Sequence, residues 1–309
     1  MPTPRPFDEP TNQARATRDP GAPAEIAGRL LAWTAAGGAA IDAGRDPDAV
    51  VAAAAATIET GSDGHRVVGL PGELPGAGVP GAGVSGVEVP LVEALRLVLA
   101  AGVVRAALAF PQPGDPLGVG ASSEFGAAAT EAGAGVALTT RRLGDLGWVP
   151  HRDERGSSYH GWRWQVVVLP PAPAPALPAE PLRLIDQAER GLRRAMRAAG
   201  DELAELDLAR WRPEAAAGRE RATAALRRHV GGLPAGWPPA ARALTNHALA
   251  LWRALAVVLA DEGAASASAA QLRAAALSDL SHAVREAVVV SFGVPAAMLL
   301  HHAGYPDGR

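Results

Sequence analysis

The sequence predicts an α+β protein in which a small mixed α/β sheet domain is followed by an all-α helical bundle domain. Three observations support this fold class. Short runs with the apolar alternation of strands are interspersed with helical patterns up to residue 169. A proline-rich stretch follows at Pro170–Pro181, and beyond it apolar residues recur every three or four positions, as on amphipathic helices. With 309 residues the chain is long enough for two domains of ordinary size.

The N-terminal part of the chain begins with a polar, proline-rich segment. We expect residues 1–23 to be a disordered tail, because they hold too few apolar residues to build a core. Two helices should follow, at Ala24–Ala43 and Asp46–Thr60. The second helix has Asp46 as an N-cap and Pro47 at its first position, where the missing N–H of proline is not needed.

The rest of the first domain, which we place at residues 24–169, should form a sheet with helices between its strands. Trp162, Trp164 and Val166 alternate with polar residues, as in a strand that is buried on one face. The loop Pro71–Gly86 contains overlapping G-x-G-x-x-G patterns, but a proline lies inside them and no helix opens after them. It is therefore interpreted as a loop and not as a dinucleotide site. The expected strands are His65–Leu70, Val103–Phe110, Gly135–Thr140, Leu146–Pro150 and Gly161–Leu169, and the further helices are Pro90–Ala101 and a segment from Ser122 or Ser123 to Gly133.

The proline-rich stretch marks the domain boundary. Residues 170–181 should form a stiff polyproline linker that extends roughly 3 Å per residue. The second domain, residues 182–309, should be an antiparallel helical bundle, because its helices are amphipathic and their connections are short. Its expected helices are a long one from about Ile185 to Leu206, then Glu214–Val230, Pro239–Glu262, Ser268–Phe292 and a short one near Ala296–His302.

The composition excludes several classes of function. The chain has no cysteine, which rules out disulfides, thiolate catalysis and cysteine-ligated metal sites and suits the cytoplasm. The formal net charge of -3 provides no general attraction to nucleic acid or to anionic membranes. The apolar stretches Leu244–Ala260 and Ala287–Leu300 are interrupted by polar residues or too short to span a membrane. We expect a soluble cytoplasmic protein with no cofactor and no bound metal.

One candidate site is the loop that follows the strand at Val103–Phe110. A strand-to-helix loop with glycines and a serine cap can offer backbone N–H groups to an anion. The residues concerned are Asp115, Gly118, Gly120 and Ser122. The alternative is structural, with Asp115 and Pro116 forming a turn and Ser122 capping the next helix. No Lys-Ser/Thr pair is present, so the loop is not a Walker phosphate loop.

A second candidate is the hairpin between His151 and Arg163, the densest cluster of reactive side chains in the chain. Its histidines and carboxylates could ligate a metal or carry out acid–base chemistry. The alternative is a charged hairpin tip, with His151 and His160 as cross-strand neighbours at its base. If the strand before the Asp115 loop neighbours the last strand of the domain, loop and hairpin share one pocket, in which Arg105 or Arg163 binds an anion.

A third pattern lies in the helical half. Asp279, His282 and Glu286 share one helix face, a spacing that carboxylate–histidine metal sites use in bundles. Matching ligands on other helices are missing, so a solvated polar face is the simpler interpretation. The arginines of Arg183–Arg228 are interleaved with acidic residues, which favours a salt-bridged surface over nucleic-acid binding.

Two segments resemble sequences of a known protein group. They are Arg105–Gly118, which contains Pro-Gln-Pro-Gly-Asp-Pro, and Leu206–Glu214, which reads Leu-Asp-Leu-Ala-Arg-Trp-Arg-Pro-Glu. Both are similar to segments of uncharacterised alanine-rich proteins from GC-rich actinobacteria. The resemblance runs from about Val89 onward and implies a shared architecture, in which a strand–loop–helix stretch precedes an alanine-rich helical half. It implies no activity, because none is attached to the group.

Two hypotheses about function follow. The first is a non-catalytic protein that binds a protein partner, forms a homo-oligomer or scaffolds an assembly. The lack of a nucleophile–base motif and the alanine-rich helices favour it. The second is an enzyme or a small-ligand or anion-binding protein that uses the α/β domain. Whether the protein is an enzyme stays open at this point, and we expect it to bind neither nucleic acid nor membranes.

Overall fold

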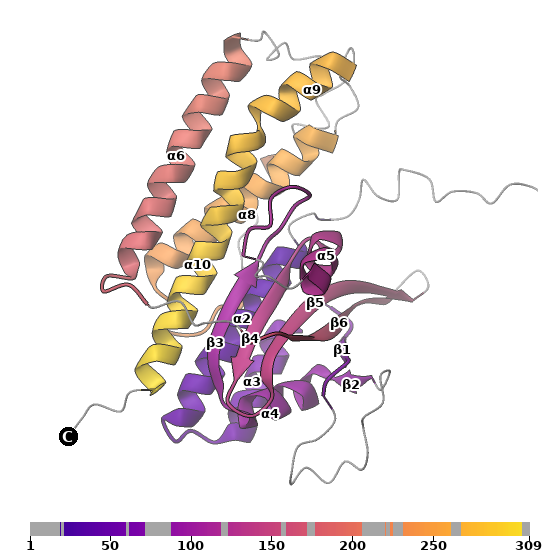
Figure 1. Ribbon diagram of the computed structural model, residues 1–309, viewed down its shortest axis with the longest axis vertical. Coiled ribbons are helices and arrows are strands. Elements are labelled where there is room, and N and C mark those ends of the chain that lie inside the picture. Colours follow the sequence, from indigo (N-terminus) through magenta and orange to yellow (C-terminus); the bar gives the residue numbers. More distant parts are fainter. Residues whose placement is uncertain are drawn as a thin grey trace, which may run out of the picture.

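A single sheet, helices on both of its faces and a group of longer helices beside it make up the described part of the protein in the computed structural model (Figure 1). The structure describes residues 19, 22–59, 62–71, 88–118, 123–155, 159–171, 177–205, 220, 223–224, 231–260 and 267–304. These residues form a protein of the α+β class, as the sequence predicts.

The sheet has six strands in the order β2-β1-β6-β5-β4-β3. Their bounds are β1 His65–Val68, β2 Val89–Pro90, β3 Val103–Ala109, β4 Gly135–Thr140, β5 Gly144–Arg155 and β6 Tyr159–Leu169. The last four strands pair in antiparallel orientation in the order of the sequence, with a loop and α5 between β3 and β4 and only a few residues between β4 and β5 and between β5 and β6. Strand β1 joins β6 in parallel, and the short β2 pairs with β1 in antiparallel orientation.

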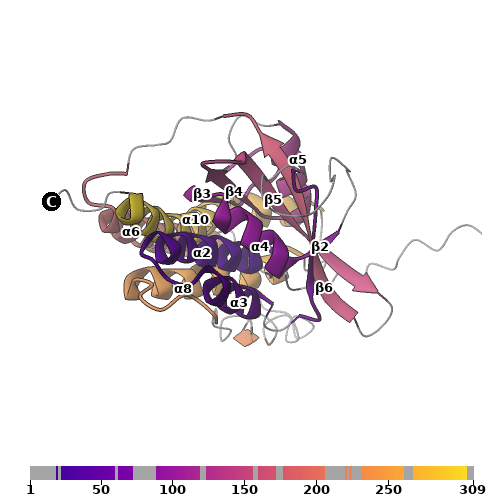
Figure 2. The same ribbon diagram turned by 90° about the horizontal axis from the view of Figure 1, so that it is seen from below.

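The helices divide unequally between the two faces of the sheet. Their bounds are α2 Ala22–Asp42, α3 Pro47–Ile58, α4 Leu91–Ala100, α5 Ser123–Ala132, α6 Leu182–Glu205, α8 Pro239–Ala260, α9 Ala267–Ala276 and α10 Ser278–Gly304. Figure 2 shows α10, α2 and α4 next to the sheet, with α8 and α3 on their far side. We call the face under these helices the inner face. Among the described helices, the outer face contacts only α5.

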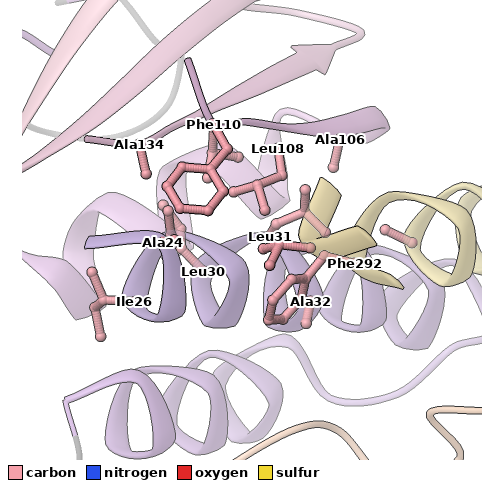
Figure 3. Close-up of a cluster of buried hydrophobic side chains, with 14 of the residues drawn as sticks. Ala24, Ile26, Leu30, Leu31, Ala32, Ala106, Leu108, Phe110, Ala134 and Phe292 are labelled. Atoms are coloured by element: carbon pink, nitrogen blue, oxygen red, sulfur yellow. The ribbon is translucent and has the colours of Figure 1, made fainter. Parts of the chain in front are cut away.

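The hydrophobic core lies between the inner face and α2. This helix buries residues around its whole circumference, which is typical of a helix enclosed by other elements. Figure 3 shows Leu108 and Phe110, from β3 and the residue after it, above Leu31 of α2 and close to Phe292 of α10. A Cβ atom on Gly28 would lie 2.3 Å from Cζ of Phe292, so glycine is required for α2 and α10 to approach this closely.

The core is continuous across the two halves of the chain. Buried residues from α2 at one end of the sequence to α10 at the other belong to one cluster. The two predicted domains, residues 24–169 and 182–309, therefore share one hydrophobic interior. Their division into separate domains stays a prediction. No sequence pattern indicates this sharing, because an apolar helix face does not specify which surface covers it.

Helix α10 is the central helix of the helical half. It contacts α2, α6 and α8 as well as β3. The segment Ala274–His302, which includes most of α10, is long and apolar enough to cross a membrane, but more than half of it is buried inside the protein. A long core helix meets the same criterion, so this feature is weak evidence for a membrane span.

Most predicted elements are confirmed, with differences at their ends. The N-cap of α3 is as expected, since the Asp46 carboxylate accepts hydrogen bonds from the N–H groups of Asp48 and Ala49. The break predicted before Ala296 is wrong, because α10 continues through Pro295 where its packing against α2 holds the helix together. The sequence missed β2, which has only two residues. The tail before residue 19, most of the loop Pro71–Gly86 and nearly all of the helix expected at Glu214–Val230 lie outside the described residues, as do residues 172–176 of the linker.

Candidate functional site

The loop between β3 and α5 is a compact turn. Gln112 and Asp115 exchange two backbone hydrogen bonds, each 2.9 Å long, and the N–H of Phe110 donates to the carbonyl of Leu117 at 3.0 Å. Gly118 has φ +78°, and a Cβ atom there would lie 2.5 Å from the carbonyl oxygen of Leu108. Only glycine fits this position, so the Pro-Gly-Asp-Pro motif and Gly118 together fold the loop back onto its own strand.

Asp115 is the centre of a polar cluster that links this loop to α10. Its Oδ2 accepts hydrogen bonds from Nδ1 of His282, at 2.6 Å, and from the guanidinium of Arg285. The other guanidinium nitrogen of Arg285 donates to the carbonyl of Phe110 at 2.9 Å. The side chain of Arg285 is only 2% exposed, so its charge depends on these partners. We call Asp115, His282 and Arg285 the loop anchor.

The loop anchor sets the protonation of Asp115. The hydrogen bond from His282, and then the hydrogen bond and positive charge of Arg285, lower the pKa of the Asp115 carboxyl below its ordinary value. The carboxylate therefore stays ionised at neutral pH. An ionised carboxylate that already accepts two hydrogen bonds suits a structural tie better than a general acid.

A pocket of about 330 Å³ lies beside the loop, between it and α5. Its lining consists of Gln112, Pro113, Gly114, Asp115, Pro116, Gly126 and Thr130. The hydroxyl of Thr130 donates to the carbonyl of Gly126 at 2.7 Å, and Asp115 is the one ionisable residue among the described residues of the wall. Of the residues predicted to bind a ligand, only Asp115 lines this pocket, and Gly120 and Ser122 fall outside the described residues.

The predicted shared pocket between loop and hairpin does not form. It required β3 and β6 to be neighbours, but β4 and β5 lie between them, because the sheet places each of these four strands beside the next in sequence. Arg105, on β3, donates to the hydroxyl of Thr139 at 3.0 Å and lies 3.8 Å from the carboxylate of Asp145. Arg105 therefore contacts residues of β4 and of the start of β5, and two strands separate β3 from Arg163 on β6.

The hairpin residues are also placed differently from the prediction. His151 pairs with Arg163, and His160 pairs with Glu154, so the two histidines are not cross-strand neighbours. Because successive side chains alternate between the faces of a strand, the register puts His151 and His160 on opposite faces of the hairpin. The N–H of His160 donates to the carboxylate of Asp63 just before β1, which ties the hairpin to that strand.

The described residues contain no group of three or more histidine and acidic side chains that could hold a metal ion. Asp279, His282 and Glu286 are all exposed on one face of α10, and His282 is hydrogen-bonded to Asp115. The helix therefore uses this face to hold the loop.

Sequence reasoning missed a second buried ion pair cluster at the N-terminus. Arg253 of α8 is almost fully buried and donates to both carboxylate oxygens of Asp19, at 3.1 and 3.2 Å, and to the carboxylate of Glu25. Glu25 also pairs with Arg29 at 2.6 Å. Arg253 lies inside an apolar helix pattern, and nothing local distinguishes a buried arginine from one that reaches solvent.

His65 is a further buried titratable group that the sequence did not single out. It is 2% exposed, and its Nδ1 accepts a hydrogen bond from Nε1 of Trp164 at 3.1 Å. Burial, together with the positive charge of Arg29, lowers the pKa of His65 to about 4, so the ring is neutral at physiological pH. Its position in the core, under Trp164, is that of a packing residue.

Two family models match the chain. One is described as Rv1486c-like protein, N-terminal domain, and matches residues 27–180, and the other is described as Rv1486c-like protein, C-terminal domain, and matches residues 186–289. The chain belongs to the Rv1486c-like protein family. This agrees with the resemblance to actinobacterial proteins to which no activity is attached. Neither the curated proteins nor the solved structures include a match to the chain.

The boundary between the two Rv1486c-like segments falls at the end of the predicted linker. The loop anchor crosses this boundary, since Asp115 belongs to the N-terminal segment and His282 and Arg285 belong to the C-terminal one. In this family member the Pro-Gly-Asp-Pro loop therefore joins the sheet to the helical half.

Proposed function

We propose that the protein binds another protein through its helical half and acts as a binding or scaffolding component and not as a catalyst. The observation that carries this proposal is a set of exposed aliphatic side chains on two successive helices. Val258 and Leu259 at the end of α8 are 38% and 43% exposed, and Leu272 on α9 is 50% exposed. Large apolar side chains that water reaches are typical of surfaces that other proteins cover.

The position of these side chains favours a partner over the protein's own core. Figure 1 shows α6, α9 and the C-terminal end of α8 extending past the end of the sheet. The sheet therefore does not cover this end of the helical half. A helix of the partner can pack its ridges between the side chains of α8 and α9, as helices pack in bundles.

The charged residues of the described interior support the same proposal. Asp115, Glu25 and Asp145 each face an arginine, and these contacts connect separate elements of the fold. A catalytic acid or base needs to exchange its proton with a substrate, and buried ion pairs suppress that exchange. The absence of cysteine and the modest net charge favour a cytoplasmic protein that works without nucleic acid or a membrane.

The test replaces exposed leucines by charged residues and measures partner binding. The L259E/L272E variant should lose the partner that the wild-type protein retains after cross-linking in extracts of its own cells, because a carboxylate cannot be buried in an apolar contact. Leu182, 47% exposed at the start of α6, provides the matched control, and L182E should keep the partner. Light scattering of the purified proteins shows whether the partner is a second copy of the chain.

One further variant separates partner binding from chemistry at a predicted site residue. H160A should keep partner binding, because His160 is exposed on the hairpin, far in the sheet from the helical half. If H160A is stably folded and yet loses the partner, or if L259E/L272E keeps it, the proposed function is wrong.

A further inference from the structure

The outer face of the sheet carries a row of basic side chains across three strands. Arg66 of β1 is in register with Arg163 of β6, and Arg163 is in register with His151 of β5. Residues in register on neighbouring strands have side chains on the same face. We call Arg66, Arg163 and His151 the basic row.

The two arginines of the basic row face solvent, and His151 is partly buried. Arg66 and Arg163 are exposed, while the residues on either side of them in sequence, among them Val67 and Trp164, are buried on the inner face. Helix α5 covers a different part of the outer face, where Phe125 packs on Val149. Arg66 and Arg163 are not covered by α5, since both side chains are exposed.

The two arginines have no acidic partner among the described residues. Asp153 is the nearest carboxylate on this face of β5, two residues from His151, but it is bound by Arg155 at 2.8 Å. Glu88 lies 3.8 Å from the same Arg155. These two acidic groups are thus paired with Arg155, and no carboxylate among the described residues pairs with Arg66 or Arg163.

This arrangement is unfavourable for the isolated protein. Like charges directly opposite each other on neighbouring strands destabilise a sheet. The buried Nε2 of His151, in the same row, has no hydrogen-bond partner among the described residues. A row of this kind becomes favourable only when negative groups lie against it.

The neighbouring side chains add further hydrogen-bond donors. A Cβ atom on Gly161 would lie 2.6 Å from the hydroxyl of Tyr159, so this ring folds over Gly161 toward the row. Gln165 is exposed one step further along β6 on the same face. Guanidinium, imidazole, phenol and amide groups together form a donor-rich surface, which fits carboxylate oxygens.

We propose that the basic row binds an acidic segment of the partner protein, with carboxylates of that segment bridging Arg66 and Arg163. Each guanidinium can hold one carboxylate through two parallel hydrogen bonds. Neighbouring strands are roughly 5 Å apart, so two acidic side chains that are close in the partner can reach both arginines. This inference rests on the proposed protein-binding function, but it concerns a different surface from that of Leu259 and Leu272.

The test uses a fluorescein-labelled oligoglutamate peptide as the probe, at low salt, and follows its fluorescence anisotropy. The wild-type protein should bind it, and R66Q/R163Q should bind roughly tenfold or more weakly, since two exposed charge contacts are lost. Arg142 is exposed in the turn between β4 and β5, away from the row, and R142Q is the matched control with unchanged affinity.

Several results would overturn the inference. These are no binding by the wild-type protein, an equal loss in R142Q and R66Q/R163Q, or a single-stranded oligonucleotide that binds more tightly than oligoglutamate with the same dependence on the two arginines. The far-ultraviolet circular dichroism of each variant establishes that it is folded. If the wild-type protein fails to bind oligoglutamate while L259E/L272E still loses the partner, only this inference is wrong and the proposed function stands.

Discussion

The two faces of the β1–β6 strand pair put neighbouring residues into opposite environments. On the inner face His65 is buried against Trp164 and kept neutral. On the outer face Arg66, the next residue, lies exposed opposite Arg163, and both are charged. The difference shows which side chains the fold requires. The inner pair stabilises the sheet through packing and a hydrogen bond, whereas the outer pair places two like charges opposite each other, which does not stabilise the sheet.

The largest expected effect is the pH dependence of the free energy of unfolding that His65 causes on the inner face. The pKa of His65 is lowered from 6.5 to about 4 in the folded protein, so between these values the unfolded chain binds one more proton than the folded one. The contribution of the neutral His65 to the free energy of unfolding is therefore fully present above pH 6.5. It is lost as the pH falls toward 4, and the loss is about 3 kcal/mol at most. Urea unfolding across this range should show the decrease in the wild-type protein and a shallower one in H65Q, whose side chain does not titrate. Parallel curves for the two proteins would contradict the neutral, buried imidazole.

The second prediction compares two arginines with different surroundings. Arg285 is buried and bound by Asp115 and the carbonyl of Phe110, whereas Arg163 is exposed and has no partner among the described residues. R285A should reduce the free energy of unfolding by about 2 to 3 kcal/mol, because it leaves the carboxylate and the carbonyl unpaired. R163A should change it by less than about 0.5 kcal/mol. If urea unfolding shows equal losses of unfolding free energy in R285A and R163A, the prediction that the buried arginine contributes more to stability is wrong.

The third prediction concerns the close approach of β1 and β6. A Cβ atom on Gly161 would lie 2.8 Å from the backbone carbonyl oxygen of Gly64, which cannot move aside as a flexible side chain can. G161A should lower the free energy of unfolding by about 1 to 2 kcal/mol through overpacking. Gly191 of α6 has no atom near an added Cβ, and the control G191A should be neutral or stabilising. A neutral G161A would mean that the two strands lie further apart than described.

Elements with a local signal were predictable from the sequence. Alternating tryptophans and valines located β6, and the Asp46–Pro47 pair located the start of α3. The break before Ala296 was wrong because a proline normally ends a helix, whereas the packing of α10 outweighs that preference. The shared core of the two halves could not be predicted, since it depends on which surfaces meet after folding.

The candidate site shows the same limit. Asp115 stands out in the sequence, but its partners His282 and Arg285 follow it by 167 and 170 residues, and no local spacing connects them. Arg66 is an ordinary polar residue of a short strand when the sequence alone is considered. Only the register of β1 with β6 shows that it faces Arg163. Contacts of this kind are set by the topology of the sheet and not by sequence neighbours.

The central claim is that Arg66 and Arg163 bind a partner and do not stabilise the fold. The smallest expected effect tests this claim most directly. The measurement is the urea unfolding of R66Q/R163Q beside the wild-type protein at low salt. Removing two opposed like charges should leave the free energy of unfolding unchanged or raise it by about 0.5 kcal/mol, and the gain should shrink in high salt. A loss of about 1 kcal/mol or more would contradict the account, because it would mean that the two arginines stabilise the folded chain itself.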